Sequence, residues 1–180
     1  MNELLNPSPG NLILVVAPHA GGAIMLDLIA HLACRGPLRL LDGGNRFDVY
    51  HCNLAVAKAL QDETSKLPAV LEHIQLARAF TCYQVVSLLA AIPAETFPTL
   101  VLDLLATFYD ESASFDESYR LLRQSLEHLR RLNRLAPVAV SARPSPLGGR
   151  PELLEILKEA AGQVWTLEPE LLPAAPRLFD

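Results

Sequence analysis

Short runs of apolar residues alternate along the chain with longer segments whose apolar residues recur at helical spacing, and this alternation restricts the fold most. Continuous apolar runs bounded by Gly, Pro or polar residues are typical of strands buried on both faces. We expect strands at Asn11–Ala17, Leu38–Asp42, Glu72–Ala77, Thr99–Leu105, Pro137–Ala142 and Val164–Leu167. We expect helices at Gly21–Cys34, Val49–Leu60, Thr81–Ile92, from Ser114 to about Arg134, and at Pro151–Ala161, with a polar connection up to Leu67.

Strands that alternate with helices of about 10 to 18 residues predict a parallel sheet, because each parallel crossover needs a helix to return the chain to the same edge. The prediction is an α/β fold of three layers, with helices on both faces of the sheet. An apolar content of 51% agrees with a sheet covered on both sides. The 180 residues fit one domain, with a core at about 11–168 and an irregular tail at 169–180.

Several side chains have predicted structural roles. Thr81 is expected to cap one helix, and Ser114 with Glu117 to form a capping box at the start of the longest one. Trp165 and the three cysteines, Cys34, Cys52 and Cys82, are expected to be buried. The buried stripe of the longest helix is expected to be Tyr119, Leu122, Leu126, Leu129 and Leu132.

Charge and hydropathy exclude some function classes. A net charge of −5 argues against bulk attraction to nucleic acid or to anionic membranes. Residues 12–34 are apolar, but Pro18 and the glycines that follow interrupt them, and Asp27 and His31 would place polar groups in lipid. No membrane span is expected. Unpaired, scattered cysteines and a first segment without Lys or Arg favour a cytoplasmic protein without a signal peptide.

The segment VVAPHAGGAIM, residues 15–25, has the strand–turn–helix shape of a phosphate-binding P-loop. The P-loop pattern places Lys and then Ser or Thr at the end of the turn, and here those places hold Ala23 and Ile24. Gly21 and Gly22 remain to make the bend. Such turns also occur throughout α/β folds for packing reasons alone.

Three later segments stand in the order of one family. These are LDGGNRF (41–47), LARAFTCYQ (76–84) and TLVLDLL (99–105), followed by a long helix and PVAVSARP. Together with the turn they resemble the ATPase core of RecA-type recombinases and their paralogues, over roughly residues 11–168. The resemblance implies a RecA-like P-loop NTPase fold, in which Asp103 matches the Walker B aspartate and Gly44 stands where an acid would polarise the attacking water.

Departures from the family pattern decide the expected function. Ala23 removes the charge that would face the β and γ phosphates, and Ile24 removes the hydroxyl that would hold Mg²⁺. Asp103 would then have little metal to hold, and Asp42 is expected to be a strand-end residue bound by backbone amides. The resemblance therefore implies a non-catalytic RecA-like module, without catalytic residues or cofactor, that acts through a protein partner or as a homo-oligomer in DNA recombination or repair.

The alternative is an atypical ATP-binding protein or ATPase. Backbone amides of Gly21 and Gly22 would then hold phosphate, with ATP and Mg²⁺ as ligands and Asp103 as the remaining acid. The chain has only three lysines, Lys58, Lys66 and Lys158, and none follows a predicted strand. That scarcity counts against a borrowed lysine.

Seven arginines and no lysine occur between Arg120 and Arg150, with one acid, Glu127, among them. Most fit the solvated face of a helix, but Arg143 and Arg150 flank a loop directly after a strand end. In the resembling family this region contacts DNA, so the two are candidate contacts for nucleic acid or for a partner's phosphates. His19 and the other four histidines are scattered and predict no metal site, and Ser141 has no triad motif around it.

Overall fold

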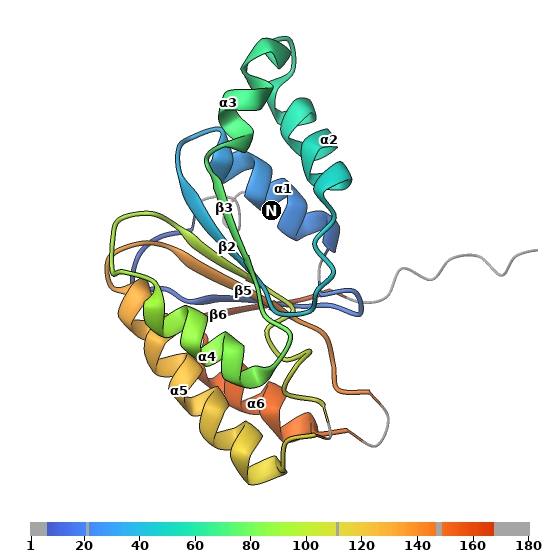
Figure 1. The fold of residues 1–180 in the computed structure, drawn as a ribbon, viewed down its shortest axis with the longest axis vertical. Coiled ribbons are helices and arrows are strands. Elements are labelled where there is room, and N and C mark those ends of the chain that lie inside the picture. The colour runs from blue at the N-terminus through green and yellow to red at the C-terminus, as the bar shows by residue number, and fades with distance from the viewer. Residues whose placement is uncertain (1–6, 21, 111, 147–148, 168–180) are drawn as a thin grey trace, which may run out of the picture.

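The computed structural model describes residues 7–20, 22–110, 112–146 and 149–167. Its strands form one six-stranded sheet in the order β3-β2-β4-β5-β1-β6, and every pair is parallel (Figure 1). The strands are β1 (Ile13–Val16), β2 (Leu38–Asp42), β3 (Ile74–Arg78), β4 (Thr99–Leu102), β5 (Val138–Ala142) and β6 (Gln163–Thr166).

Helices cover both faces of this sheet, as predicted (Figure 1). One face carries α1 (Gly22–Ala33), α2 (Val49–Leu60) and α3 (Leu67–Leu71), and the other carries α4 (Cys82–Ala91), α5 (Phe115–Asn133) and α6 (Pro151–Ala160). A single 3₁₀ turn, η1 (Thr64–Lys66), leads into α3. The three-layer α/β prediction is therefore confirmed.

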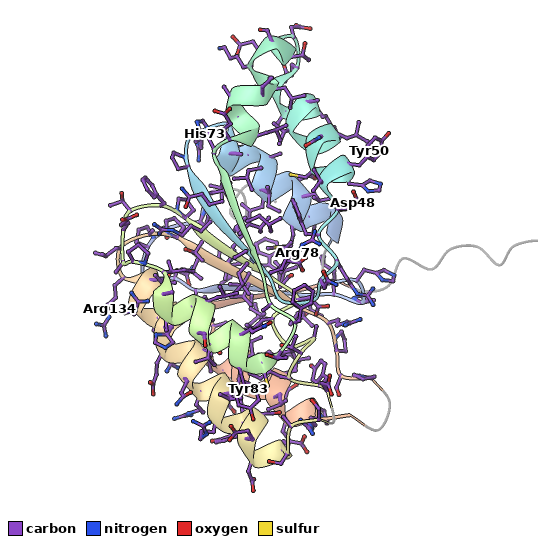
Figure 2. The ribbon with its side chains drawn as sticks, in the orientation of Figure 1. Asp48, Tyr50, His73, Arg78, Tyr83 and Arg134 are labelled. Carbon is purple, nitrogen blue, oxygen red and sulfur yellow. The ribbon has the colours of Figure 1, made fainter. Side chains whose placement is uncertain are left out.

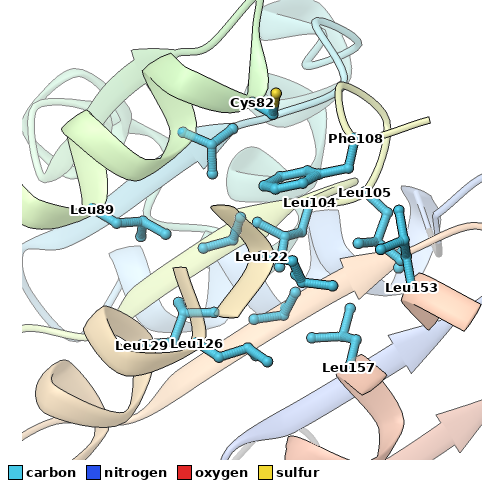
Figure 3. Close-up of a cluster of buried hydrophobic side chains, with 14 of the residues drawn as sticks. Cys82, Leu89, Leu104, Leu105, Phe108, Leu122, Leu126, Leu129, Leu153 and Leu157 are labelled. Atoms are coloured by element: carbon cyan, nitrogen blue, oxygen red, sulfur yellow. The ribbon is translucent and has the colours of Figure 1, made fainter. Parts of the chain in front are cut away.

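Alternation along the strands divides the apolar residues between two cores. In β1, Leu14 and Val16 pack with the helices α4, α5 and α6, whereas Ile13 and Val15 pack with α1, α2 and α3. This follows from the two-residue repeat of a strand, whose successive side chains point to opposite faces. Figure 3 shows the core under α4, α5 and α6, where the ring of Phe108 lies among leucines.

Three predicted boundaries are wrong for local reasons. β4 ends at Leu102 and not at Leu105, because Asp103 has φ 48, a left-handed conformation that cannot continue a strand. The segment up to Leu67, which was expected to be a polar connection, instead contains the 3₁₀ turn η1 and leads into the helix α3. β3 starts at Ile74 because Glu72 and His73 still donate backbone hydrogen bonds to Pro68 and Val70 of α3.

The longest helix departs from its predicted details. Tyr119 is 41% exposed and Leu121 is buried in its place, while the four predicted leucines are buried. Ser114 Oγ accepts a hydrogen bond from Glu117 N, but the Glu117 carboxylate binds Arg120 instead of returning to the cap. Only half of the expected capping box is therefore formed.

The remaining local predictions, on one helix cap and on the burial of Trp165 and the cysteines, are confirmed in part. Thr81 caps α4 by accepting from Gln84 N. Cys52 and Cys82 are buried as predicted, but Cys34 is exposed, so the burial prediction is wrong for one of the three thiols. Trp165 is only partly buried.

Among the described residues no helix is long and apolar enough to cross a membrane, and the apolar stretch 12–34 is divided between β1 and α1 by the turn that joins them.

Candidate functional site

A cavity of about 130 Å³ opens at the carboxyl ends of the central strands. The connections from β1 and β2 lead to helices on one face of the sheet, and those from β4 and β5 lead to helices on the other. Parallel sheets bind ligands where neighbouring connections diverge in this way. The lining comes from the turn after β1, from α1, from the ends of β2, β4 and β5, and from the start of α2: His19, Ala20, Gly22, Met25, Leu26, Ile29, Asp42, Arg46, Phe47, Asp48, His51, Leu102, Asp103 and Ser141.

Two described backbone amides of the turn after β1 donate hydrogen bonds within the turn itself. Ala20 N donates to Ala17 O at 2.9 Å, and Gly22 N donates to His19 O at 3.2 Å. An anion site at a helix start needs such amides free to point at the ligand. Ala23 is exposed, and Ile24 packs partly against the α1–α3 core. Gly21, the other predicted residue of the turn, lies outside the described residues.

Asp103 lies at the floor of this cavity, immediately after β4. It is 2% exposed, and its backbone N donates to Ser141 Oγ at 3.0 Å. Arg143 Nε lies 3.1 Å from Asp103 Oδ2 in an ion pair, and the Arg143 backbone also contributes to the environment of this carboxylate. Burial raises the pKa of Asp103, and the neighbouring Arg143 opposes that rise.

Asp42 is a second buried carboxylate beside the cavity, at the end of β2. It is fully buried and accepts hydrogen bonds from Arg46 N at 3.2 Å and Phe47 N at 3.0 Å, as expected for a strand-end residue held by backbone amides. Arg78 Nε lies 3.5 Å from its Oδ2, and Arg78 also donates to Phe47 O at 2.9 Å. Figure 2 shows Arg78 near the middle of the molecule, close to the strand ends.

The loop after β2 passes very close to Asp103. A Cβ added at Gly43 would lie 3.2 Å from the backbone oxygens of Leu102 and Asp103, and one at Gly44 would lie 2.7 Å from Asp103 Oδ2. Gly44 is the position that the sequence matched to the acid of the water-polarising strand. With Asp103 in this place, position 44 has no room for a side chain.

Both arginines proposed as partner or nucleic-acid contacts make internal contacts. Arg143 pairs with Asp103, and its backbone oxygen accepts from Tyr109 Oη at 3.2 Å. Burial, and then the charge of Asp103, raises the pKa of that tyrosine. Arg150 donates to Phe108 O at 3.0 Å, to Ser118 Oγ at 2.7 Å and to Ala113 O at 2.5 Å, and so ties the start of α6 to α5 and to the segment that precedes α5.

Two more arginines of the basic run are also engaged. Arg120 pairs with Glu117, and Arg131 donates to the backbone oxygens of Leu89 and Ile92 at the end of α4. The three that remain on the exposed side of α5 and at its end are Arg123, Arg130 and Arg134, the last labelled in Figure 2. The run therefore supplies less free positive charge than its sequence suggests.

The sequence analysis did not predict that Asp48 and His51, at the start of α2, line the cavity. Asp48 caps α2 by accepting from Tyr50 N and His51 N, and it also pairs with the His51 ring at 2.8 Å, which lowers the pKa of Asp48 together with the bond from Tyr50 N (Figure 2). An Asp directly before an apolar helix was the available signal. Within the described part of the chain, no three His, Cys, Asp or Glu side chains are grouped to hold a metal ion.

Chemically, the cavity combines apolar walls with carboxylates at its floor. Those carboxylates belong to Asp42 and Asp103, and the lining holds one arginine, Arg46, and no lysine. Comparison of the chain with known protein families and with curated proteins finds no match.

Proposed function

We propose that this chain is a non-catalytic RecA-like module that acts through protein association, in DNA recombination or repair beside an active ATPase. The family assignment rests on the ordered sequence segments, with which the parallel α/β sheet is consistent. The observation that carries the association is an open sheet edge beside an apolar groove.

That edge is β3, which pairs only with β2 among the described strands. Among the described strands its outer backbone groups face no neighbour in the sheet, and β3 contains no Pro. Leu76, in the middle of the strand, is 40% exposed. An unpaired edge of this kind accepts an extended segment of another chain as an added strand.

A groove of about 290 Å³ runs beside the same edge. Its lining is mostly aliphatic and comes from β2, β3 and the end of α4: Arg39, Leu40, Leu41, Gln75, Leu76, Ala77, Leu88, Ala91, Ile92 and Pro93. Main-chain hydrogen bonds along β3 would supply affinity, and an apolar side chain seated in the groove would supply specificity. The proposed occupant is an extended segment of a RecA-type ATPase partner.

The strand-end cavity supports the non-catalytic part of the proposal. Asp103 is engaged by Arg143, position 44 has no room for a second acid, and Ala23 brings no positive charge. A triphosphate placed there would meet two buried carboxylates. We therefore expect no ATP hydrolysis and no measurable heat of ATP binding with Mg²⁺ at millimolar nucleotide.

The test uses the two edges of the sheet as a matched pair. Leu76→Lys places a charge on β3, and Val164→Lys places one on β6, where Val164 is 39% exposed. Wild type and both variants are used as baits in lysate of the native source, captured proteins are identified by mass spectrometry, and the complex is rebuilt from purified components.

The proposal is supported if wild type and Val164→Lys capture a RecA-type ATPase and the amount captured by Leu76→Lys is at least tenfold lower. Binding that survives Leu76→Lys, or that is lost equally in Val164→Lys, contradicts the proposed surface. Micromolar binding of ATP by calorimetry would contradict the non-catalytic assignment and favour the atypical ATP-binding alternative.

A further inference from the structure

We propose that two copies of this chain associate through the outer face of α5, with Asp116 of each copy paired with Arg123 of the other and the two Tyr119 rings in contact between these pairs. This surface lies on the face of the sheet that carries α4, α5 and α6, and it shares no residue with the β3 groove. The inference therefore does not depend on the partner proposed above.

Exposed aromatic rings mark this surface. Phe115 and Tyr119, one turn apart on α5, are 40% and 41% exposed, and their ring centroids lie 6.4 Å apart. Tyr83, on the neighbouring helix α4, is 50% exposed (Figure 2). Tyr and Phe are enriched in protein interfaces, because a rigid ring contributes a large contact area at a small cost in conformational entropy. Three such rings on two adjacent helices indicate a surface that another protein chain covers.

Two exposed charges of opposite sign lie on the same side of α5. Asp116 and Arg123 are separated by two turns of the helix, about 10.5 Å along its axis. Both are exposed, and within the described part of the chain neither has an ion-pair or hydrogen-bond partner. Arg120 lies between them but adds no third free charge, because it donates two hydrogen bonds to the Glu117 carboxylate, at 3.0 and 2.7 Å.

This arrangement of charges is complementary to a reversed copy of itself. In a contact with two-fold symmetry, each pairing between the copies occurs twice. When two α5 helices pack antiparallel with the axis beside Tyr119, Asp116 of each copy faces Arg123 of the other. The Tyr119 rings then meet at the axis, and the Arg120 charges near it are neutralised by Glu117.

The balance of charge selects a second copy over other occupants. A nucleic-acid backbone would be attracted by Arg123 and repelled by Asp116, and the chain as a whole carries a net charge of −5. A protein surface of one sign would likewise meet one favourable and one unfavourable charge. A second copy pairs both charges at once and covers the exposed rings.

The self-association is expected to be weak, since a contact between one helix of each copy is smaller than the interfaces of stable dimers. We expect a Kd of about 10–100 µM. Sedimentation equilibrium between about 5 and 500 µM should then show the average mass rising from that of one chain towards that of two.

Charge reversal tests the two ion pairs. Asp116→Arg and Arg123→Asp are each expected to raise the Kd at least tenfold, because each variant places like charges opposite one another twice in the dimer. An equimolar mixture of these two variants is expected to associate within about threefold of wild type, because opposite charges then face one another at every pairing. Arg134→Asp, an exposed reversal at the far end of α5, and Leu76→Lys on β3 are the controls and are expected to stay within twofold of wild type.

Circular dichroism and thermal unfolding check that each variant is folded. Tyr119→Ala keeps the charges and removes the ring at the axis, and it is also expected to weaken association at least tenfold, so the test stays valid if a reversed charge destabilises α5. Wild type that stays monomeric up to about 500 µM would overturn the inference and leave the surface to a different protein. A dimer that survives both reversals, a mixture of the two that does not associate, or a dimer lost in Leu76→Lys would overturn it as well.

Discussion

A Cβ on Gly44 would lie 2.7 Å from Oδ2 of Asp103 and 2.8 Å from its Cβ, closer than such atoms approach in proteins. The two residues are separated by 59 positions in the sequence, and they meet because β2 and β4 are neighbours in the sheet. The absence of a side chain at position 44 is therefore a packing requirement of Asp103, which lies against Arg143.

Gly44→Ala is expected to destabilise the protein by about 1–3 kcal/mol, the usual cost of overpacking a buried site. In the background Asp103→Gly the same substitution is expected to cost less, because the three clashing atoms are gone and Gly accepts the left-handed conformation of position 103. Urea unfolding of wild type, the two single variants and the double variant measures the coupling free energy between positions 44 and 103.

Gly22→Ala, where an added Cβ meets nothing within 4 Å, is the control and is expected to change stability by less than about 0.5 kcal/mol. Additive costs at positions 44 and 103 would contradict the packing argument.

Introducing the two residues that a P-loop has at positions 23 and 24 is expected not to produce ATPase activity. Ala23→Lys with Ile24→Thr supplies the charge and the hydroxyl, but Asp103 remains paired with Arg143 and Gly44 still offers no acid to the attacking water. Phosphate release should stay at the level of a protein-free control. Turnover above that level, absent from wild type, would show that the rest of the site is competent.

Arg150 is expected to be a structural clamp. Arg150→Met removes donors to Phe108 O, Ser118 Oγ and Ala113 O, and is expected to cost about 2–3 kcal/mol, since bonds to charged groups are worth about 1.5–3 kcal/mol each but are partly replaced by water. Arg123→Ala, on the exposed side of α5, is the control and is expected to stay within about 0.5 kcal/mol. Urea unfolding compares the two. A stable Arg150→Met protein that loses nucleic-acid binding would instead assign Arg150 to that function.

Asp103 is expected to make the protein less stable as pH rises. Burial raises its folded-state pKa above the value in the unfolded chain, so the folded state holds this proton more tightly. Its stabilising contribution is full below the unfolded pKa, near 3.9, and is lost as pH rises through the folded pKa. The slope is at most about 1.4 kcal/mol per pH unit.

The measurement for Asp103 is the free energy of unfolding of wild type and Asp103→Asn between pH 3 and pH 8. The stability of Asp103→Asn relative to wild type should increase from about pH 4 upward and then level off. A difference that stays constant over this range, or that falls with pH, would show that the folded-state pKa is not raised.

Local patterns predicted the architecture well because each element is encoded in neighbouring residues. The apolar runs of β1, β2 and β5 and the caps at Thr81 and Ser114 needed no distant partner to be recognised. The end of β4 was missed because TLVLDLL continues as an apolar pattern through Asp103, while the backbone turns at that residue.

The cavity was only partly predictable. Asp103 was identified from its match to a Walker B aspartate in TLVLDLL, but the sequence did not indicate that Arg46, Phe47, Asp48 and His51 line the same cavity. Arg143 and Arg150 looked like free cations in the sequence, because their acceptors lie 40 and at least 32 positions away.

By itself the sequence determined the parallel three-layer fold, the two faces of each buried strand and the absence of a lysine and of a hydroxyl residue at positions 23 and 24. These depend on residue type and on periods of 2 and 3.6 residues, which are local properties. Tertiary structure alone decided that the buried Asp103 pairs with Arg143, that Gly44 must lack a side chain and that β3, among the described strands, pairs only with β2. Those relations depend on the strand order, which brings residues distant in the chain within contact and leaves other groups without a partner.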